Sequence, residues 1–136
     1  MKILVVHRQK EVIAKVKSVL QSNQSIIRFS DSGLDGLLAA RIEVFDLIIC
    51  STDLPVITGF ELVRSLKENS INKRTPVVFL ADQIDDKVLY LGNSLGVAGM
   101  FIPREMDKQL ITIVSEQVKV APDTRWEDLL TSSRLN

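Results

Sequence analysis

Residues 45–66 read FDLIICSTDLPVITGFELVRSL, in which a short apolar run leads through a turn into a helical pattern. The run Leu47 to Cys50 contains no polar residue, which is typical of a strand buried on both faces of a sheet. After the turn, Leu62, Val63 and Leu66 recur at steps of three and four residues, the period of an amphipathic helix. The segment therefore predicts one strand and one helix of a parallel sheet.

The same alternation extends over the rest of the chain. Other apolar runs predict further strands buried on both faces: Ile3 to Val6, Ile26 to Phe29, Val77 to Leu80 and Gly99 to Ile102. Helical periodicity predicts further helices: Val12, Ile13, Val16, Val19 and Leu20; Leu34, Leu37 and Leu38; Ile84, Val88, Leu91 and Leu95; Leu110, Ile111, Val114 and Val118. Candidate helix caps are Asp31 or Ser32, Thr58 and Asp82. Long connections between apolar strands imply right-handed crossovers, and hence a doubly wound α/β domain with helices on both faces of a parallel sheet.

The composition fits one globular domain of 136 residues. Lys and Arg number 17 and so do Asp and Glu, so no net charge draws the chain to nucleic acid or to an acidic membrane. The single cysteine, Cys50, excludes an internal disulfide, is expected in the core, and is typical of a reducing compartment. The apolar run at the amino terminus is too short for a signal peptide or a membrane span. We therefore expect a cytoplasmic protein.

The composition changes near Pro122. We expect a domain over residues 1–120 and a tail over residues 121–136, where Trp126, Leu129 and Leu130 have the spacing of a short amphipathic helix. Such a tail is expected to pack on its own domain or on a neighbouring molecule. It has too few basic residues for a DNA-binding domain.

Several stretches are similar, in order and spacing, to one known family. They are KILVV (2–6), FDLII (45–49) leading to Leu54-Pro55 and GFEL (59–62), PVVFL (76–80), and Leu95-Gly96. With them, residues 2–119 resemble the receiver domain of bacterial two-component response regulators. The resemblance implies a flavodoxin-like, five-stranded parallel sheet in the strand order 2-1-3-4-5.

In that family, two acids after the first strand and an Asp ending the third strand bind Mg²⁺, and that Asp accepts a phosphoryl group from a histidine kinase. A hydroxyl residue after the fourth strand and a Lys-Pro pair after the fifth complete the site, which must neutralise charge on the transferring oxygens. The matching positions here are His7 and Arg8 for the acids, Ser51 for the acceptor, Ala81 for the hydroxyl, and Pro103 with Arg104 for the Lys-Pro pair. The resemblance therefore implies a pseudo-receiver, which keeps the scaffold but not the phosphoryl chemistry.

Asp53 keeps a second interpretation open. It is the only carboxylate in the loop after the third apolar run, two positions beyond Ser51. Because side chains alternate along a strand, a shift of two residues keeps the same face, and Asp53 would then be the acceptor of an active receiver in a phosphorelay. The other interpretation is an ion pair between Asp53 and Arg8, whose guanidinium would occupy the vacated metal site.

Other chemistries have weaker support. His7, Ser51 and Asp53 are the residue types of a hydrolase triad, but no G-x-S-x-G elbow surrounds Ser51. His7 and Asp53 are too few ligands for a structural zinc site. Residues 7–11 lack the Gly-rich turn with which a flavodoxin-like site would bind phosphate. We therefore expect no catalytic residue, no metal and no other cofactor.

A surface remains as the candidate site of action. In receivers, the face formed by the fourth helix, fifth strand and fifth helix binds partners or a second receiver. The matching apolar positions here are Leu89, Tyr90, Met100, Ile102 and Ile113. We expect this face to bind a protein of a signalling pathway or to form a homodimer, independently of phosphorylation, without direct contact to nucleic acid or membrane.

Overall fold

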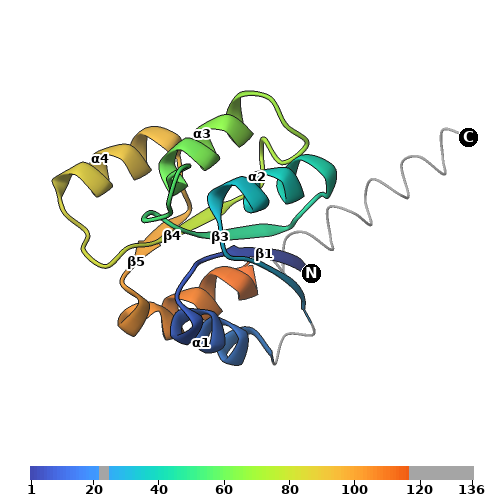
Figure 1. Ribbon diagram of the computed structural model, residues 1–136. Coiled ribbons are helices and arrows are strands. Elements are labelled where there is room, and N and C mark those ends of the chain that lie inside the picture. Colours follow the sequence, from blue (N-terminus) through green and yellow to red (C-terminus); the bar gives the residue numbers. More distant parts are fainter. Residues whose placement is uncertain (22–24, 117–136) are drawn as a thin grey trace, which may run out of the picture.

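The computed structural model describes residues 1–21 and 25–116, which form one parallel sheet between two layers of helices. The strands are β1 (Lys2–Val6), β2 (Ile26–Ser30), β3 (Leu47–Ser51), β4 (Val77–Leu80) and β5 (Gly99–Phe101), paired in the order β2-β1-β3-β4-β5. The helices are α1 (Lys10–Leu20), α2 (Gly33–Ile42), α3 (Gly59–Glu68) and α4 (Asp86–Leu95). A short 3₁₀ turn, η2 (Pro103–Glu105), leads into helical residues 106–116. The predicted doubly wound sheet and its strand order are confirmed (Figure 1).

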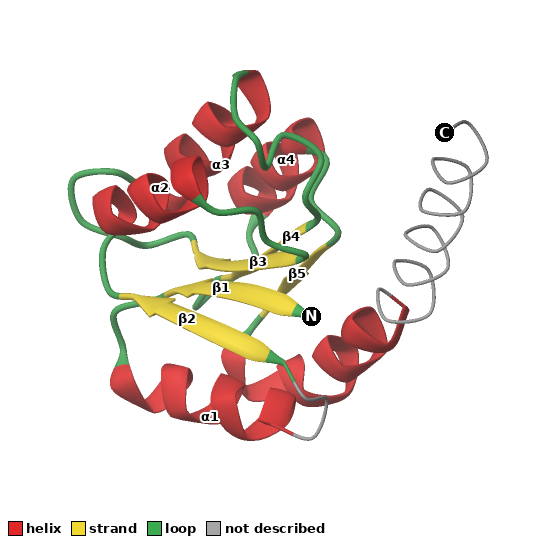
Figure 2. Ribbon diagram, turned by 90° about the vertical axis from the view of Figure 1, so that its right-hand side faces the viewer, coloured by secondary structure: helices red, strands yellow, loops and turns green. Residues whose placement is uncertain are grey.

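Each face of the sheet has its own helices. Figure 2 shows α1 and the helical residues 106–116 on one face, and α2, α3 and α4 on the other. The predicted tail, residues 121–136 with Trp126, Leu129 and Leu130, lies outside the described residues.

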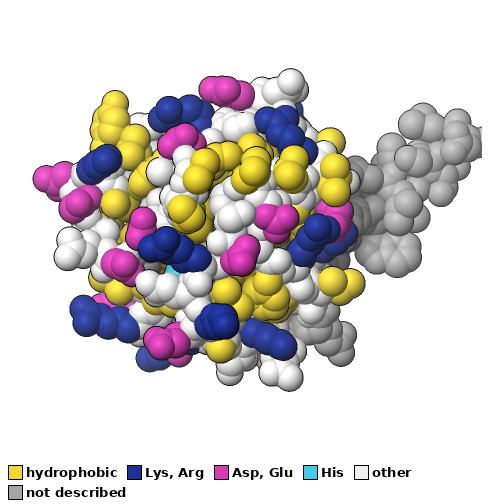
Figure 3. Space-filling model, viewed as in Figure 1, with side chains coloured by type: hydrophobic (Ala, Val, Ile, Leu, Met, Phe, Trp, Pro, Cys, Tyr) yellow, Lys and Arg dark blue, Asp and Glu magenta, His cyan; other side chains and the backbone are white. Residues whose placement is uncertain are grey.

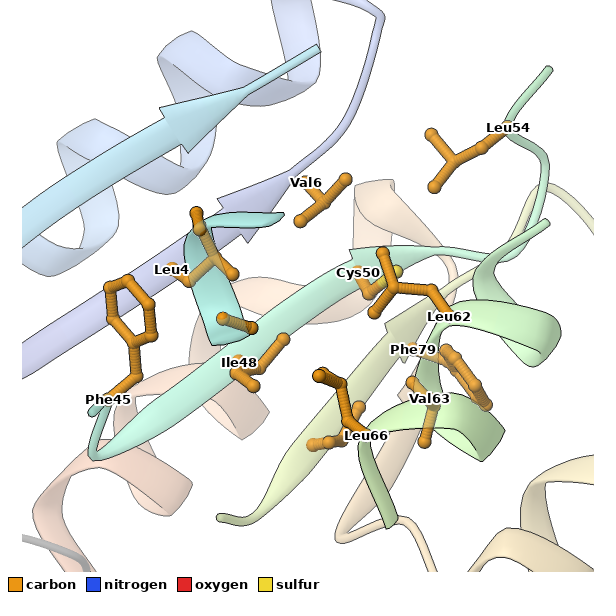
Figure 4. Packing of buried hydrophobic residues seen from close by; sticks show 13 residues of the cluster. Leu4, Val6, Phe45, Ile48, Cys50, Leu54, Leu62, Val63, Leu66 and Phe79 are labelled. Atoms are coloured by element: carbon orange, nitrogen blue, oxygen red, sulfur yellow. The ribbon is translucent and has the colours of Figure 1, made fainter. Parts of the chain in front are cut away.

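The core consists of two apolar layers, because successive strand residues point to opposite faces of the sheet. One layer joins alternate residues of β1, β3 and β4 to the buried faces of α2 and α3 (Figure 4). The other joins the intervening residues to α1 and to the helix at 106–116. Cys50 lies fully buried in the first layer, as predicted.

The apolar runs predict that all five strands are buried on both faces of the sheet. This is confirmed for the central strands β1, β3 and β4 and is wrong for β2 and β5. Both are edge strands, with a neighbour on one side only. Ile26 at the start of β2 is largely exposed, and every residue of β5 is only partly buried.

The predicted buried face of helix α2 is only partly correct, because Leu37 packs against the core but Leu34 and Leu38 do not. Leu34 and Leu38 are more than half exposed, while the small residues Gly33, Gly36, Ala39 and Ala40 face the core. A Cβ atom at Gly33 would lie 2.2 Å from the Ile57 carbonyl oxygen, and one at Gly36 would lie 2.7 Å from the Val6 side chain. The helix therefore packs too closely for larger residues to occupy its inner face.

Two of the predicted helix caps are present. The Ser32 hydroxyl accepts a hydrogen bond from the Asp35 N–H, and the Thr58 hydroxyl accepts one from the Glu61 N–H. The prediction of Asp82 as a cap is wrong, because α4 begins only at Asp86. The carboxylate that caps it is Asp85, which accepts from the Val88 N–H at 2.9 Å.

Asn72, which the sequence patterns did not single out, joins two loops at the amino-terminal edge of the sheet. Its buried amide nitrogen donates to the carbonyl oxygens of Ala40 and Glu43, at 2.5 and 2.7 Å. Its oxygen accepts from the Phe45 N–H at 2.8 Å and from the Thr75 hydroxyl at 2.9 Å. The side chain thus satisfies buried and partly buried polar groups of both loops.

Asn72→Ala should lower the free energy of unfolding by about 3 kcal/mol, because it leaves several buried polar groups without partners. The matched control is Asn93→Ala on the exposed surface of α4, which removes the same amide without exposing such groups. Urea denaturation measures both. Equal midpoints for the two variants would show that the Asn72 contacts do not stabilise the fold.

Candidate functional site

The carboxyl ends of β1 and β3 place two polar residues side by side. Val6 pairs with Cys50 in the parallel register, so His7 and Ser51 follow at matching positions. Both are buried, with 4% and 5% of their surface exposed. They line a cavity of about 10 Å³ together with Arg8, Gln9, Asp53 and Asp82. The cavity holds at most about one water molecule.

His7 is fixed from two directions. Its backbone N–H donates to the Ser30 carbonyl at 3.0 Å, and its Nδ1 accepts from the Gln9 N–H at 3.1 Å. Burial lowers the pKa of His7; the carboxylate of Asp82 opposes this, the charge of Arg8 adds to it, and Asp53 opposes it more weakly. A neutral imidazole with its proton on Nε2 is consistent with both the lowered pKa and the occupied Nδ1.

Ser51 is turned into its own loop. Its hydroxyl donates to the Asp53 carbonyl at 3.3 Å and accepts from the Asp53 N–H at 3.1 Å. Gly59, at the start of α3, holds this loop closely: a Cβ there would lie 2.0 Å from the Ser51 carbonyl oxygen. Within the described residues no hydrogen bond joins Ser51 to His7, so the pair lacks the base-to-nucleophile contact of a triad.

Arg8 and Asp53 both line the cavity, but their side chains do not form an ion pair. The predicted pair between them is therefore wrong. The ion pairs of the described residues join Lys2 to Glu43, Lys15 to Asp107 and Arg28 to Glu43. Arg8 and Asp53 are both exposed, and a pair in water gains little over separate solvation. No three acidic, His or Cys side chains in the described ranges gather as a metal site.

Two other predicted residues lie outside this cavity. Ala81 is buried, and its N–H donates to the Phe101 carbonyl. Pro103 lines a wider cavity of about 560 Å³ between α1, η2 and the loop after β4. Its carbonyl accepts a hydrogen bond from the Lys15 amine at 2.9 Å.

Gln9 and Asp82 also line the cavity, as expected for residues that directly follow the first and fourth apolar runs, although the candidate site set did not include them. Asp82 was assigned to a helix cap, although its place just after β4 also put it at the carboxyl ends of the strands. Gln9 contributes through its backbone N–H, a contact that residue type does not indicate.

The predicted partner face is only partly exposed. Leu89 and Tyr90 on α4 are 41% and 72% exposed. Met100 is half-buried beneath α4, where a Cβ at Gly92 would lie 2.3 Å from its sulfur. Ile113 is half-buried against the core, and Ile102 lines the 560 Å³ cavity. The exposed apolar part of this face is therefore on α4.

Within the described residues, no helix combines the length and apolar character that crossing a membrane requires.

Comparison with solved structures supports the fold. Chemotaxis protein CheY4 of Vibrio cholerae is 25% identical, with a TM-score of 0.75 over 85% of this chain and 96% of that chain. The receiver domain of DrrB in its BeF3-activated form is also 25% identical, with a TM-score of 0.76 over 87% of this chain and 97% of that chain.

Comparison with curated sequences finds the cell cycle response regulator CtrA of Brucella ovis and of Brucella abortus, each 26% identical over 94 residues. The match covers 68% of this chain but only 40% of the length of those proteins. The family model of the response regulator receiver domain matches residues 3–115. The chain therefore belongs to the response regulator receiver domain family.

Proposed function

We propose that this receiver domain signals without accepting a phosphoryl group and acts through contact with another protein. The observation that carries the proposal is the cavity at the ends of β1 and β3. It holds the buried pair His7 and Ser51 at positions that resemble the family's metal-binding and acceptor acids.

The residues of this cavity are poorly matched to phosphoryl transfer. The reaction spreads negative charge over three oxygens, which Mg²⁺ and a lysine neutralise in the family. Mg²⁺ prefers a near-octahedral set of oxygen ligands, and a neutral imidazole is a poor substitute for a carboxylate. The lining carboxylates, Asp53 and Asp82, are accompanied by Arg8, whose charge repels a divalent cation.

The acceptor position is also poorly suited to attack on phosphorus. The Ser51 hydroxyl is engaged with Asp53 of its own loop and has no base within hydrogen-bond distance in the described part of the chain. The cavity of about 10 Å³ leaves no space for a phosphoryl group unless the loop opens.

The exposed apolar side chains of α4 offer a contact surface. Tyr90 and Leu89 are neighbours on this helix and are accessible in the described structure. An exposed aromatic residue beside an aliphatic one is the composition of a protein interface core. The occupant is a protein of the same signalling pathway or a second copy of this domain.

Saturating Mg²⁺ with beryllofluoride should leave the amide NMR spectrum unchanged, and a small phosphodonor should add no phosphoryl mass, because His7, Arg8 and Ser51 stand at the positions that match the family's acids. The control is Asp53→Asn. A spectral change or mass increase that disappears in Asp53→Asn would assign the acceptor to Asp53 and contradict the proposal.

Tyr90→Glu should weaken capture of partner proteins, or self-association, by at least about tenfold, because a buried charge at an interface costs more than about 1.4 kcal/mol. Ile71→Glu is the control, since Ile71 is a similarly exposed apolar residue outside α4. Pull-downs and analytical ultracentrifugation measure the two effects. Capture that survives Tyr90→Glu would show that Leu89 and Tyr90, which we call the α4 face, do not form the binding surface.

The stability of the domain should depend on the titration of His7, which is the only histidine of the chain. Its pKa in the folded state is lowered from 6.5, so the unfolded chain binds the proton more tightly. The stabilising contribution is complete above pH 6.5 and is lost as the pH falls from 6.5 through the lower folded value.

His7→Asn is the matched variant, because its side-chain oxygen can still accept from the Gln9 N–H but does not titrate. Urea denaturation between pH 8 and pH 5 should show the wild type losing stability relative to this variant below about pH 6.5. Parallel profiles would mean that His7 titrates alike in both states.

A further inference from the structure

Helix α2 presents a row of large apolar side chains to solvent. Leu34, Leu38 and Ile42 are spaced four residues apart along one face, and they are 53%, 54% and 73% exposed. Val44, 61% exposed, follows just beyond the helix. Figure 3 shows hydrophobic side chains gathered over this part of the surface. We call these four residues the α2 stripe.

The exposure of the α2 stripe does not result from poor packing of the helix on the sheet. Gly33 and Gly36 hold α2 against the Ile57 carbonyl and the Val6 side chain, where any Cβ would clash. Rotation of the helix to bury Leu34 and Leu38 would bring larger side chains into those contacts. A helix that is apolar on both faces is normally covered on both.

Residue 116, where the described chain ends, and the last residue of α2 both lie near the amino-terminal ends of the strands. Residues 106–116 return along the opposite face of the sheet and finish near the amino terminus (Figures 1 and 2). Met1 and Ile113 pack against the same buried cluster. Next to Met1, the Lys2 amine pairs with Glu43 at 2.5 Å, immediately after Ile42.

The sequence beyond this point carries a matching apolar face. Leu129 and Leu130 follow Trp126 by three and four residues, the spacing of side chains that share one face of an amphipathic helix. Pro122 removes a backbone donor from any helix that would continue past it, so the chain can change direction before Trp126.

The chain between residue 116 and Trp126 is long enough to reach α2 on the other face of the sheet. Trp126 lies ten residue steps beyond position 116, and ten steps of extended chain span about 33 Å. Two layer spacings of about 10 Å each separate the helices on the two faces of the sheet.

We propose that Trp126, Leu129 and Leu130 pack on the α2 stripe of the same chain. Four partly exposed aliphatic side chains offer much less than the ~800 Å² per partner of a standard protein interface, which disfavours a second copy as the occupant. A tethered segment does not need that area, because the tether gives it an effective concentration in the millimolar range.

The first test uses the fluorescence of Trp126, the only tryptophan in the chain. In the full chain its emission should be that of a buried indole, with little quenching by acrylamide. Leu38→Glu should shift the emission to longer wavelength and increase the quenching. Leu89→Glu is the control, since Leu89 is an exposed leucine on α4, and it should change neither.

The second test joins the two segments covalently. Leu38→Cys with Leu129→Cys should form a disulfide on mild oxidation, since the proposed contact brings their Cα atoms within about 7 Å. The native Cys50 does not interfere, because it is fully buried and its pKa is raised to about 12. Leu89→Cys with Leu129→Cys is the control and should stay reduced.

The outcomes are distinct. A cross-linked monomer together with emission that is independent of protein concentration supports the proposal. A cross-linked dimer, or emission that shifts with concentration, would assign the stripe to a second copy and overturn it. Solvent-exposed emission in the unmodified chain would show that the tail leaves the stripe open.

Discussion

The parallel pairing of β1 with β3 is the constraint on which both the core and the site depend. These two strands lie inside the sheet and are covered on both faces, and His7 and Ser51 at their carboxyl ends are buried. The register that pairs Val6 with Cys50 brings His7 beside Ser51. The pairing of the apolar strands therefore sets the geometry of the site.

The proposed function requires this fold to hold uncharged residues at positions that resemble the acidic positions of the family. Carboxylates gathered at one site repel each other, and their pKa values rise unless a cation compensates. In this chain the buried positions hold an imidazole whose pKa is lowered and a hydroxyl bonded to its own loop. Neither of these two buried residues carries a charge at neutral pH, so they do not repel each other as two buried carboxylates would.

The fold was predictable because burial on both faces of the central strands leaves uninterrupted apolar runs in the sequence. The pocket at the strand ends was predictable for the same reason, and it contains His7, Arg8, Ser51 and Asp53. The features that the sequence pattern did not predict depend on how closely helices, strands and loops approach each other in the folded chain. The exposure of Leu38 follows from the close approach at Gly36, and the absent pair between Arg8 and Asp53 reflects the weak gain of surface charges. The role of Asn72 depends on two loops distant in sequence.

Helix α2 shows why periodicity alone could not identify its buried face. Its residues are apolar around most of the circumference, and the sheet takes the side with glycine and alanine because close approach excludes larger groups. The large side chains are then left for another partner. Helix α3 lies between α2 and α4 on that side of the sheet (Figure 1), so the α2 stripe and the α4 face are separate surfaces. If the chain covers the first with its own tail, Leu89 and Tyr90 remain accessible for a signalling partner, and the two proposals assign different surfaces to different tasks.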